Sequence, residues 1–215
     1  PAVNNKLGWI LMESPVFIAM LVLWLCSDRR GDLVRLAFLF LFELHYFQRA
    51  FVFPFRMRGS SKMPLSIILM GVTFNTLNAL MQGGWIFYLS PESYYPIDWL
   101  TKPIFIAGFL VFIIGMYINI MSDDTIRNLR KPGDSRHYLP KGGLFNYVTS
   151  ANYFGEFVEW VGFAILTWSW SGAVFALWTF ANLAPRAARI YEQYKMELGD
   201  ELNTKKVKRM IPFIW

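Results

Sequence analysis

The chain has 215 residues, of which 55% are hydrophobic, 18% aromatic and 17% charged. This composition is too apolar and too poor in charge for an ordinary soluble domain, so it indicates an integral membrane protein. The single cysteine, Cys26, excludes an intrachain disulfide. The net charge of +6 does not indicate a nucleic-acid partner, because the basic residues are confined to short loops and the C-terminal tail.

Apolar runs that approach the length of a membrane-spanning helix recur along the chain, and we expect about six spans. The runs are residues 7–26, 33–53, 64–89, 104–121, 144–170 and 172–183, of which the last two are short or partly polar. The expected fold is therefore all-α, a polytopic transmembrane helical bundle that forms a single membrane-embedded domain over residues 1–215.

Lysine and arginine are concentrated in loops 54–63 and 122–143 and in the C-terminal segment 184–215, whereas the alternate loops have little net positive charge. The positive-inside rule places the richer segments on the cytoplasmic side of the membrane. An even number of spans then places Pro1 on the same side.

Glu13 lies about one and a half turns inside the first apolar run, where a lone charged carboxylate is costly. Pro15 follows it and cannot donate a backbone hydrogen bond, so the helix can open there and gather polar groups. Two interpretations stand: a glutamate at a helix end that reaches interfacial water, or a carboxyl group that binds or polarises a substrate oxygen.

The second run contains the segment FELHYFQRAF, which is unusually rich in hydrogen-bonding groups for a spanning helix. Glu43 and Tyr46 are three residues apart and can share one face of the helix. Tyr46 is the candidate acid, since a phenol can donate to a developing oxyanion in a dry site. The alternative is an interfacial anchor, the usual role of a lone membrane tyrosine.

Asn75, Asn78 and Gln82 form a polar line along the third run. Their spacing favours hydrogen bonds between helices, each worth about 1 kcal/mol, although the line could also form part of a cavity wall. By spacing alone, Trp9 and Phe74 are expected to pack against other side chains rather than to contact a ligand.

A polar stripe leaves the fourth run, with residues spaced by four, four and three, and a second stripe follows on the next helix. The first consists of Asn119, Asp123, Arg127 and Arg130, and the second of Asn152, Glu156 and Glu159. Arginine offers forked donors to phosphate and aspartate accepts from sugar hydroxyls, so the stripes suit a ligand with ribose and phosphate. The alternative is a solvated helix end with local ion pairs.

Several familiar nucleotide and metal motifs are missing from the sequence. It has neither a G-x-G-x-x-G segment after a strand nor a P-loop, so a nucleotide would bind without either scaffold. The two histidines, His45 and His137, and one cysteine are too few for a convincing zinc or haem site, and we expect no metal.

Four blocks, WILMESP, LHYFQRAFVF, INIMSDDTIRNLRKPG and PKGGLFNYVTSANYFGEFVEW, occur in the order in which the steroid 5α-reductases have similar motifs. The chain resembles that family from about Trp9 to its terminal PFIW, and we expect a bacterial-type member. The resemblance implies a fold similar to that of isoprenylcysteine carboxyl methyltransferase-like membrane enzymes. It also implies NADPH-dependent reduction of the C4–C5 double bond in a 3-oxo-Δ4 steroid such as testosterone or progesterone.

In the family, a glutamate in W-x-x-x-E and the tyrosine of L-H-Y-F hydrogen-bond the steroid 3-oxo group, and these positions match Glu13 and Tyr46. The remaining implied site residues contact the cofactor NADPH. They are Trp9, Arg58, Lys62, Phe74, Asn119, Asp123, Arg127, Arg130, His137, Tyr138, Asn152, Glu156, Arg186 and Tyr194.

The sequence departs from the family pattern in two places. Family members have seven spans, with an additional helix before W-x-x-x-E, and this chain begins only a few residues before Trp9. We therefore expect about six spans in this chain, against seven in the family. Arg58 and Lys62 stand in for the asparagine and arginine that are expected to meet the adenosine phosphate.

Three alternatives to a steroid reductase stay open. The first is a membrane methyltransferase of the isoprenylcysteine type, whose R-H-P-x-Y motif is faintly matched by Arg136, His137 and Tyr138, with the proline displaced to Pro140. The second is a reductase of another hydrophobic enone or a polyprenol, and the third a lipid-binding or scaffold protein of the same fold. For the reductase, the expected partners are a steroid and the lipid bilayer, without an obligate protein partner. It would lie in a bacterial inner membrane, or in the endoplasmic reticulum of a eukaryote.

Overall fold

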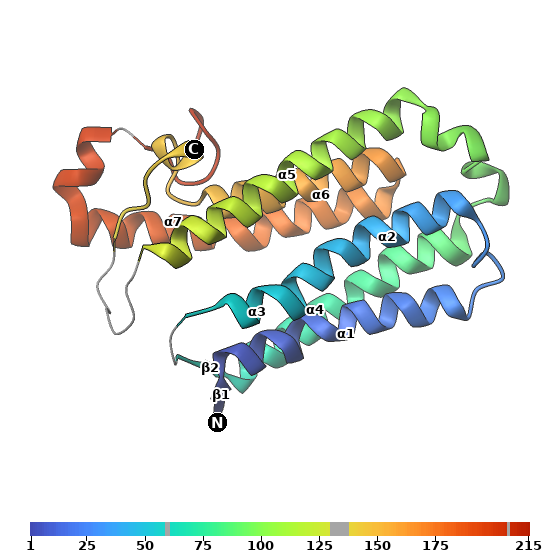
Figure 1. Ribbon diagram of the computed structural model, residues 1–215, viewed down its shortest axis with the longest axis horizontal. Helices are drawn as coiled ribbons and strands as arrows, with labels where there is room; N and C mark the ends of the chain where they lie inside the picture. The colour runs from blue at the N-terminus through green and yellow to red at the C-terminus, as the bar shows by residue number, and fades with distance from the viewer. Residues whose placement is uncertain (59–60, 130–137, 206) are drawn as a thin grey trace. The chain divides into compact units, whose positions relative to one another are not determined.

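The computed structural model describes residues 1–58, 61–129, 138–205 and 207–215 of the chain (Figure 1). Within this part the chain is predominantly helical, as the sequence predicts. It divides into two compact units, an N-terminal unit of Pro1–Pro103 and a C-terminal unit of Ile104–Trp215. A single domain over residues 1–215 stays a prediction.

The N-terminal unit contains three long helices and a small two-stranded sheet (Figure 1). The sheet pairs β1 with β2 in antiparallel fashion, with Val3 opposite Met63. In chain order the elements are β1 (Ala2–Asn4), α1 (Asn5–Leu25), α2 (Leu33–Phe47), π-helix η1 (Gln48–Val52), α3 (Phe53–Arg56), β2 (Lys62–Pro64), α4 (Leu65–Gly83), π-helix η2 (Gly84–Leu89), and the 3-10 turns η3 (Glu92–Tyr94) and η4 (Ile97–Thr101).

Local capping explains where the first two helices begin. The side chain of Asn4 accepts a hydrogen bond from the backbone N–H of Lys6 at the start of α1. Asp32 does the same for α2, where one carboxylate oxygen accepts from the N–H groups of Val34 and Arg35, both at 3.0 Å. Each cap satisfies backbone donors that have no partner inside the helix.

The second helix does not end where α2 ends, but continues through η1 into α3. A π-helical turn inserts an extra residue into the helical ladder, and such turns are frequent at functional sites. In this chain η1 begins two residues after Tyr46, so it changes which side chains of the following turn share a face with that tyrosine.

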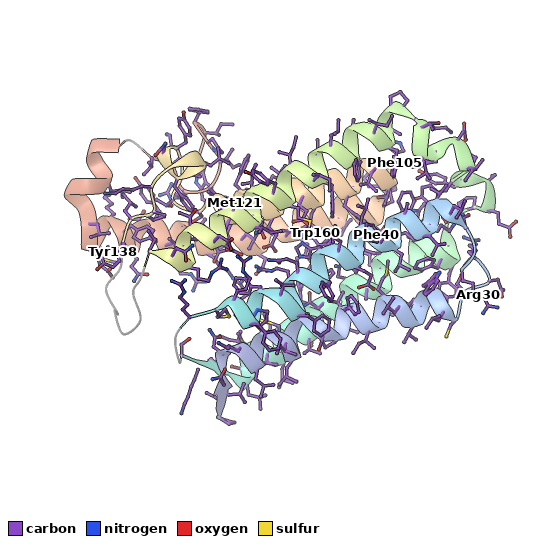
Figure 2. All side chains as sticks on the ribbon, viewed as in Figure 1. Arg30, Phe40, Phe105, Met121, Tyr138 and Trp160 are labelled. Carbon is purple, nitrogen blue, oxygen red and sulfur yellow. The ribbon has the colours of Figure 1, made fainter. Side chains whose placement is uncertain are left out.

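The C-terminal unit contains α5 (Pro103–Asn128), the 3-10 turn η5 (Gly143–Asn146), α6 (Ala151–Thr167) and α7 (Trp170–Lys205). Leu198 has non-helical backbone angles and divides α7 into two parts. The turn between α6 and α7 is short, with Trp168 in the left-handed region at φ 45°. Trp160, labelled on α6 in Figure 2, packs edge-on against Phe175 of α7. The two ring centroids are 4.7 Å apart.

Glycines let α5 and α6 approach almost backbone to backbone. A Cβ atom added to Gly115 would lie 2.2 Å from the backbone nitrogen of Glu159, and one added to Gly155 would lie 2.4 Å from that of Asn119. Real Cβ atoms essentially never come this close to backbone atoms. The glycines therefore fix the register in which the polar ends of the two helices meet.

The C-terminal segment folds back onto the start of α6. The backbone N–H of Thr149 donates to the carbonyl of Lys208 at 2.9 Å, and that of Ser150 donates to the carbonyl of Arg209 at 3.0 Å. This pairing also corrects the fifth predicted run, 144–170. The helix begins at Ala151 because the residues before it use their backbone groups to hold the tail.

Four helical segments of the described residues are long and apolar enough to cross a membrane, by length and composition. They are Asn5–Leu25, Leu33–Arg56, Leu65–Leu89 and Pro103–Asn128, which match the first four predicted runs. Phe40, labelled on α2 in Figure 2, is 65% exposed. The last two predicted spans, α6 and the start of α7, are not among the four.

Candidate functional site

Glu13 is buried between α1 and α4 instead of lying at an exposed helix end, with a relative exposure of 9%. The side-chain nitrogen of Asn75, on α4, donates to Oε2 of Glu13 at 3.0 Å and to the backbone carbonyl of Met12 at 2.9 Å. Pro15 lies inside α1, where it cannot donate to the carbonyl of Leu11 four residues earlier. The first polar group of the predicted site is thus held by an amide of a neighbouring helix.

Tyr46 of α2 is also hydrogen-bonded to α4, through Asn78. The side-chain nitrogen of Asn78 donates to the Tyr46 hydroxyl oxygen at 2.9 Å. Both side chains are almost completely buried, at 2% for Tyr46 and 0% for Asn78. Two members of the polar line expected on the third run, Asn75 and Asn78, therefore make hydrogen bonds between helices, and their partners are the two predicted catalytic residues.

An aromatic and cationic layer lies one helical turn away from these polar groups. The Arg49 guanidinium lies over the Trp9 ring at 4.8 Å and over the Phe53 ring at 4.9 Å. Trp9 precedes Glu13 by four residues and Arg49 follows Tyr46 by three, so each sits next to one of the predicted catalytic residues. Sequence reasoning did not assign Arg49 to the site, because its direction depends on the π-helical turn η1.

The other predicted cofactor residues of the N-terminal unit lie on and around α4. Phe74 is half-buried and precedes Asn75. Lys62 is exposed in β2, where it pairs in register with Asn4 of β1. Arg58 is also exposed, after the end of α3.

The two polar stripes of the C-terminal unit face one another across α5 and α6. The side-chain nitrogen of Asn119 donates to the backbone carbonyl of Asn152 at 2.9 Å. The side-chain nitrogen of Asn152 in turn donates to Oδ1 of Asp123 at 3.0 Å. The close glycine packing of α5 and α6 brings these groups within reach, so Asn119, Asp123 and Asn152 form one connected cluster.

Charged residues continue both stripes. Glu156 is half-buried and Glu159 is fully buried, one and two turns further along α6 than Asn152. Arg127 forms an ion pair with Asp124 on the same helix, which is the local pairing that a solvated helix end would show. Arg127 is therefore the least distinctive member of the first stripe.

The rest of the predicted cofactor residues are spread over the C-terminal unit. Tyr194 packs against a buried cluster of Leu139, Leu202 and Val207, and Tyr138 is half-buried beside Leu139. Arg186 is half-buried on α7, directly after Pro185. Arg130 and His137, together with Arg136 of the methyltransferase motif, lie outside the described residues.

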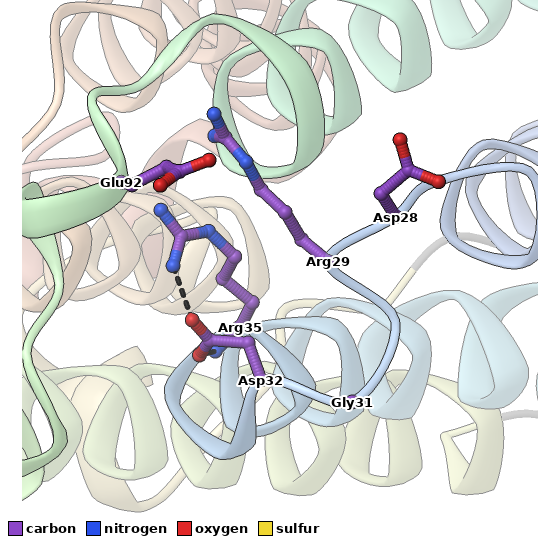
Figure 3. Close-up of a pocket in the computed structure, with 6 residues that line it drawn as sticks. All are labelled: Asp28, Arg29, Gly31, Asp32, Arg35 and Glu92. Atoms are coloured by element: carbon purple, nitrogen blue, oxygen red, sulfur yellow. Dashed lines mark hydrogen bonds and ion pairs between the residues drawn. The ribbon is translucent and has the colours of Figure 1, made fainter.

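A cavity of about 300 Å³ lies at the end of the N-terminal unit that holds the α1–α2 loop (Figure 3). Its lining is Asp28, Arg29, Gly31, Asp32, Arg35 and Glu92. Arg35 pairs with Asp32 and donates to the carbonyls of Ile86 at 2.8 Å and Pro91 at 3.3 Å. The cavity contains none of the predicted site residues, and we interpret its charges as the network that joins two loops.

Comparison with known proteins identifies the family of this chain. Residues 61–215 match the family model described as 3-oxo-5-alpha-steroid 4-dehydrogenase. The chain is 42% identical over 209 residues to 3-oxo-5-alpha-steroid 4-dehydrogenase 1 of Mus musculus, with 96% of this chain and 80% of the relative covered.

Similar relatives occur in other organisms. The human protein of the same name is 40% identical over 217 residues, which cover 99% of this chain and 81% of the relative. A steroid 5-alpha-reductase of Arabidopsis thaliana is 35% identical over 221 residues, which cover 100% of this chain and 83% of the relative. The chain therefore belongs to the 3-oxo-5-alpha-steroid 4-dehydrogenase family.

Proposed function

We propose that this protein reduces the C4–C5 double bond of a 3-oxo-Δ4 steroid, with NADPH as the reductant. The observation that carries the proposal is that Glu13 and Tyr46, far apart in sequence, are both buried and are both hydrogen-bonded to α4. Family membership and the names of the relatives support steroid reduction as the reaction class.

The proposed role of Glu13 and Tyr46 is to stabilise negative charge on the steroid 3-oxo oxygen. The Tyr46 hydroxyl and the Glu13 carboxyl, in its protonated form, donate hydrogen bonds to that oxygen. This draws electron density from the conjugated double bond and makes C5 electrophilic. Such donors contribute most in the transition state, when the oxygen acquires its charge.

NADPH, when bound, supplies a hydride, which the proposed reaction adds to C5. The π electron pair of the C4–C5 double bond shifts to C3–C4 and the carbonyl π pair moves to oxygen, which gives an enolate whose oxygen accepts hydrogen bonds from Glu13 and Tyr46. A proton then adds at C4 and restores the ketone, so the product has gained one hydride and one proton. The buried setting of the two donors strengthens their hydrogen bonds and excludes competing water.

The polar residues of the C-terminal unit offer both the hydrogen-bond acceptors and the donors that a dinucleotide would use. Asp123 is a buried carboxylate that accepts hydrogen bonds, as a ribose hydroxyl requires of its partner. Asn119, Asn152 and Glu156 extend this acceptor and donor set, and Arg186 offers a guanidinium for phosphate. Arg58, Lys62 and Arg130 are proposed as further phosphate partners.

The cofactor-binding segments are proposed to face the cytoplasm, because loops 54–63 and 122–143 and segment 184–215 carry most of the basic residues. This orientation also places the expected binding residues on the side of the membrane where NADPH is abundant. A methyltransferase would leave the arginines among these residues partly unexplained, because S-adenosylmethionine has no phosphates.

The decisive experiment is single-turnover oxidation of NADPH by the purified protein in detergent, with progesterone or testosterone as substrate. We expect a product two hydrogens heavier, and deuterium at C5 when NADPH is labelled at the transferred position. Tyr46→Phe should slow this step by about 100-fold or more, as loss of an oxyanion donor does elsewhere. Glu13→Gln should slow it as well, because the amide N–H that replaces the acidic O–H of the carboxyl is a weaker donor to the developing negative charge.

The matched control is Tyr117→Phe on α5, which removes a hydroxyl from a tyrosine that is 65% exposed. It should leave the rate unchanged. NADPH binding without reduction of any steroid would keep the cofactor and refute the substrate class. Binding of S-adenosylmethionine in place of NADPH would refute the reductase altogether.

A further inference from the structure

Helix α4 supplies one amide to each member of the proposed acid pair, Glu13 and Tyr46. Asn75 donates to Glu13 and Asn78 donates to Tyr46, at 3.0 and 2.9 Å. The two asparagines are three residues apart on one helix, so their side chains leave the same face about 5–6 Å apart. One face of α4 therefore binds a carboxyl of α1 and a phenol of α2.

The direction of these hydrogen bonds determines what the acid pair can offer to a ligand. In both contacts the asparagine nitrogen is the donor, so the oxygens of Glu13 and Tyr46 are the acceptors. A phenol that accepts from an amide still has its own hydrogen to donate, and so does the second oxygen of a protonated carboxyl. We propose that Asn75 and Asn78 are positioning residues that set Glu13 and Tyr46 as donors toward the substrate's 3-oxo oxygen.

The burial of Asn78 supports a role beyond joining two helices. Its side chain is fully buried, yet its Oδ1 atom has no hydrogen-bond partner among the residues that the structure describes. A buried amide oxygen without a partner is costly, and a purely structural contact between α2 and α4 could be replaced by apolar packing without that cost. The presence of an asparagine at position 78 is explained if its side-chain N–H is needed as a donor to the Tyr46 hydroxyl oxygen.

The same contact has a chemical consequence for Tyr46. As the phenol donates to the enolate oxygen, negative charge builds up on its own oxygen, and a hydrogen bond from Asn78 stabilises that charge. Chained hydrogen bonds of this kind strengthen one another in a buried site. The contribution of Asn78 is therefore largest in the transition state and acts only through Tyr46.

This inference rests on the proposed function, and a double-mutant cycle distinguishes failure of the inference from failure of the proposed function. The single-turnover rate of steroid reduction is measured for the wild type, Asn78→Leu, Tyr46→Phe and the double variant. We expect Asn78→Leu to slow the step at least about tenfold in the wild-type background, as loss of a supporting donor would. In the Tyr46→Phe background the same substitution should have little further effect, while NADPH affinity stays unchanged throughout. The parallel cycle pairs Asn75→Leu with Glu13→Gln.

A second readout covers variants whose turnover is too slow to measure. The dissociation constants of a 3-oxo steroid and of its 3-deoxo analogue are compared for each variant. Asn78→Leu should weaken binding of the 3-oxo steroid alone, because only that ligand uses the Tyr46 donor. If Asn78→Leu does not fold, Asn78→Ser, whose hydroxyl is too short to reach Tyr46, takes its place with the same expectation.

The matched control on the same helix is Thr73→Val, which removes an exposed hydroxyl that bonds to the Leu69 carbonyl of its own helix. It should change neither rate nor affinity. Equal slowing by Asn78→Leu in both backgrounds, or equal loss of affinity for both steroids, would show a structural role and overturn the inference. A wild type that reduces no steroid would instead refute the proposed function, whatever the asparagine variants do.

Discussion

The side-chain nitrogen of Asn152 donates a 3.0 Å hydrogen bond to Oδ1 of Asp123 and so connects α6 to α5. Because Asn119 also bonds to the Asn152 backbone, the three residues form one chain of hydrogen bonds on two helices. The affinity for a ligand that contacts Asp123 should therefore depend on the register in which α5 packs against α6. The packing of the two helices therefore assembles this cluster.

Asp123→Asn should weaken NADPH binding by about tenfold, the loss expected when a charged hydrogen-bond acceptor is replaced by a neutral one. The substitution keeps the size of the side chain, so the fold should be retained. Titration of tryptophan fluorescence with NADPH measures the affinity. Thr125→Val, which removes a hydroxyl bonded to its own helix at Met121, is the control and should bind NADPH normally. Unchanged affinity in Asp123→Asn would remove this residue from the cofactor site.

Gly115→Ala should destabilise the protein by about 1–3 kcal/mol or more, the cost of overpacking a well-packed interface. The added methyl group would lie 2.2 Å from the backbone nitrogen of Glu159, so α5 and α6 would have to move apart. Thermal unfolding in detergent should begin at a lower temperature, and NADPH affinity should fall with it. Gly84→Ala has open space around the new methyl group and is the matched control. Equal stability of the two variants would contradict the close contact.

The helices of this chain were largely predictable from its apolar runs. The first run, 7–26, corresponds to α1 at Asn5–Leu25, and the fourth, 104–121, lies within α5 at Pro103–Asn128. Composition determines such segments because a helix that spans a membrane must be apolar along its length. The beginning of α6 was not predictable, since it depends on backbone pairing with residues far along the chain.

The candidate site was predictable in its residue types but not in its partners. Asn75 and Asn78 were expected to bond to another helix, and they do, yet spacing along one helix cannot say which side chains lie opposite. The contact between Arg49 and Trp9 was missed because it depends on the π-helical turn η1, which has no clear sequence signal. Pairings of this kind are set by tertiary packing.

Arg35→Met should destabilise the protein by about 1–3 kcal/mol, because it removes the ion-pair partner of the partly exposed Asp32 carboxylate. It also removes the donor to the carbonyl of Ile86. Arg30→Met, at an exposed position of the same loop, is the control and should have little effect on thermal unfolding (Figure 2). Variants that stay folded should reduce steroid at the normal rate, since the charged cavity is structural in our interpretation. Loss of turnover in a folded Arg35→Met protein would instead make that cavity part of the active site.

Stability should fall as the pH rises above about 10, the ordinary pKa of tyrosine. Burial raises the pKa of Tyr95, so the folded protein holds the phenol proton at pH values where the unfolded chain releases it. The contribution of Tyr95 to stability is therefore constant below that range and is lost as the pH increases through it. The unfolding temperature measured between pH 8 and 11 tests this. Tyr95→Phe should flatten the curve, although it also removes the acceptor for the Trp85 indole, 2.8 Å away.

Glu43→Gln should stabilise the protein or leave its stability unchanged, in contrast to most substitutions of buried residues. Glu43 is 8% exposed on α2, and neither carboxyl oxygen has a hydrogen-bond partner among the residues described by the structure. A buried carboxyl in that setting costs free energy whether it stays charged or takes up a proton, and a neutral amide of the same size avoids the charged state. Thermal unfolding of the variant in detergent measures the difference. Turnover of Glu43→Gln should stay near the wild-type value, whereas Glu13→Gln should lose turnover. The two glutamates of the same unit would then differ in role, with Glu13 needed for catalysis and Glu43 only reducing stability. A marked loss of stability in Glu43→Gln would mean that a water, a lipid or a bound ligand pairs with this carboxyl.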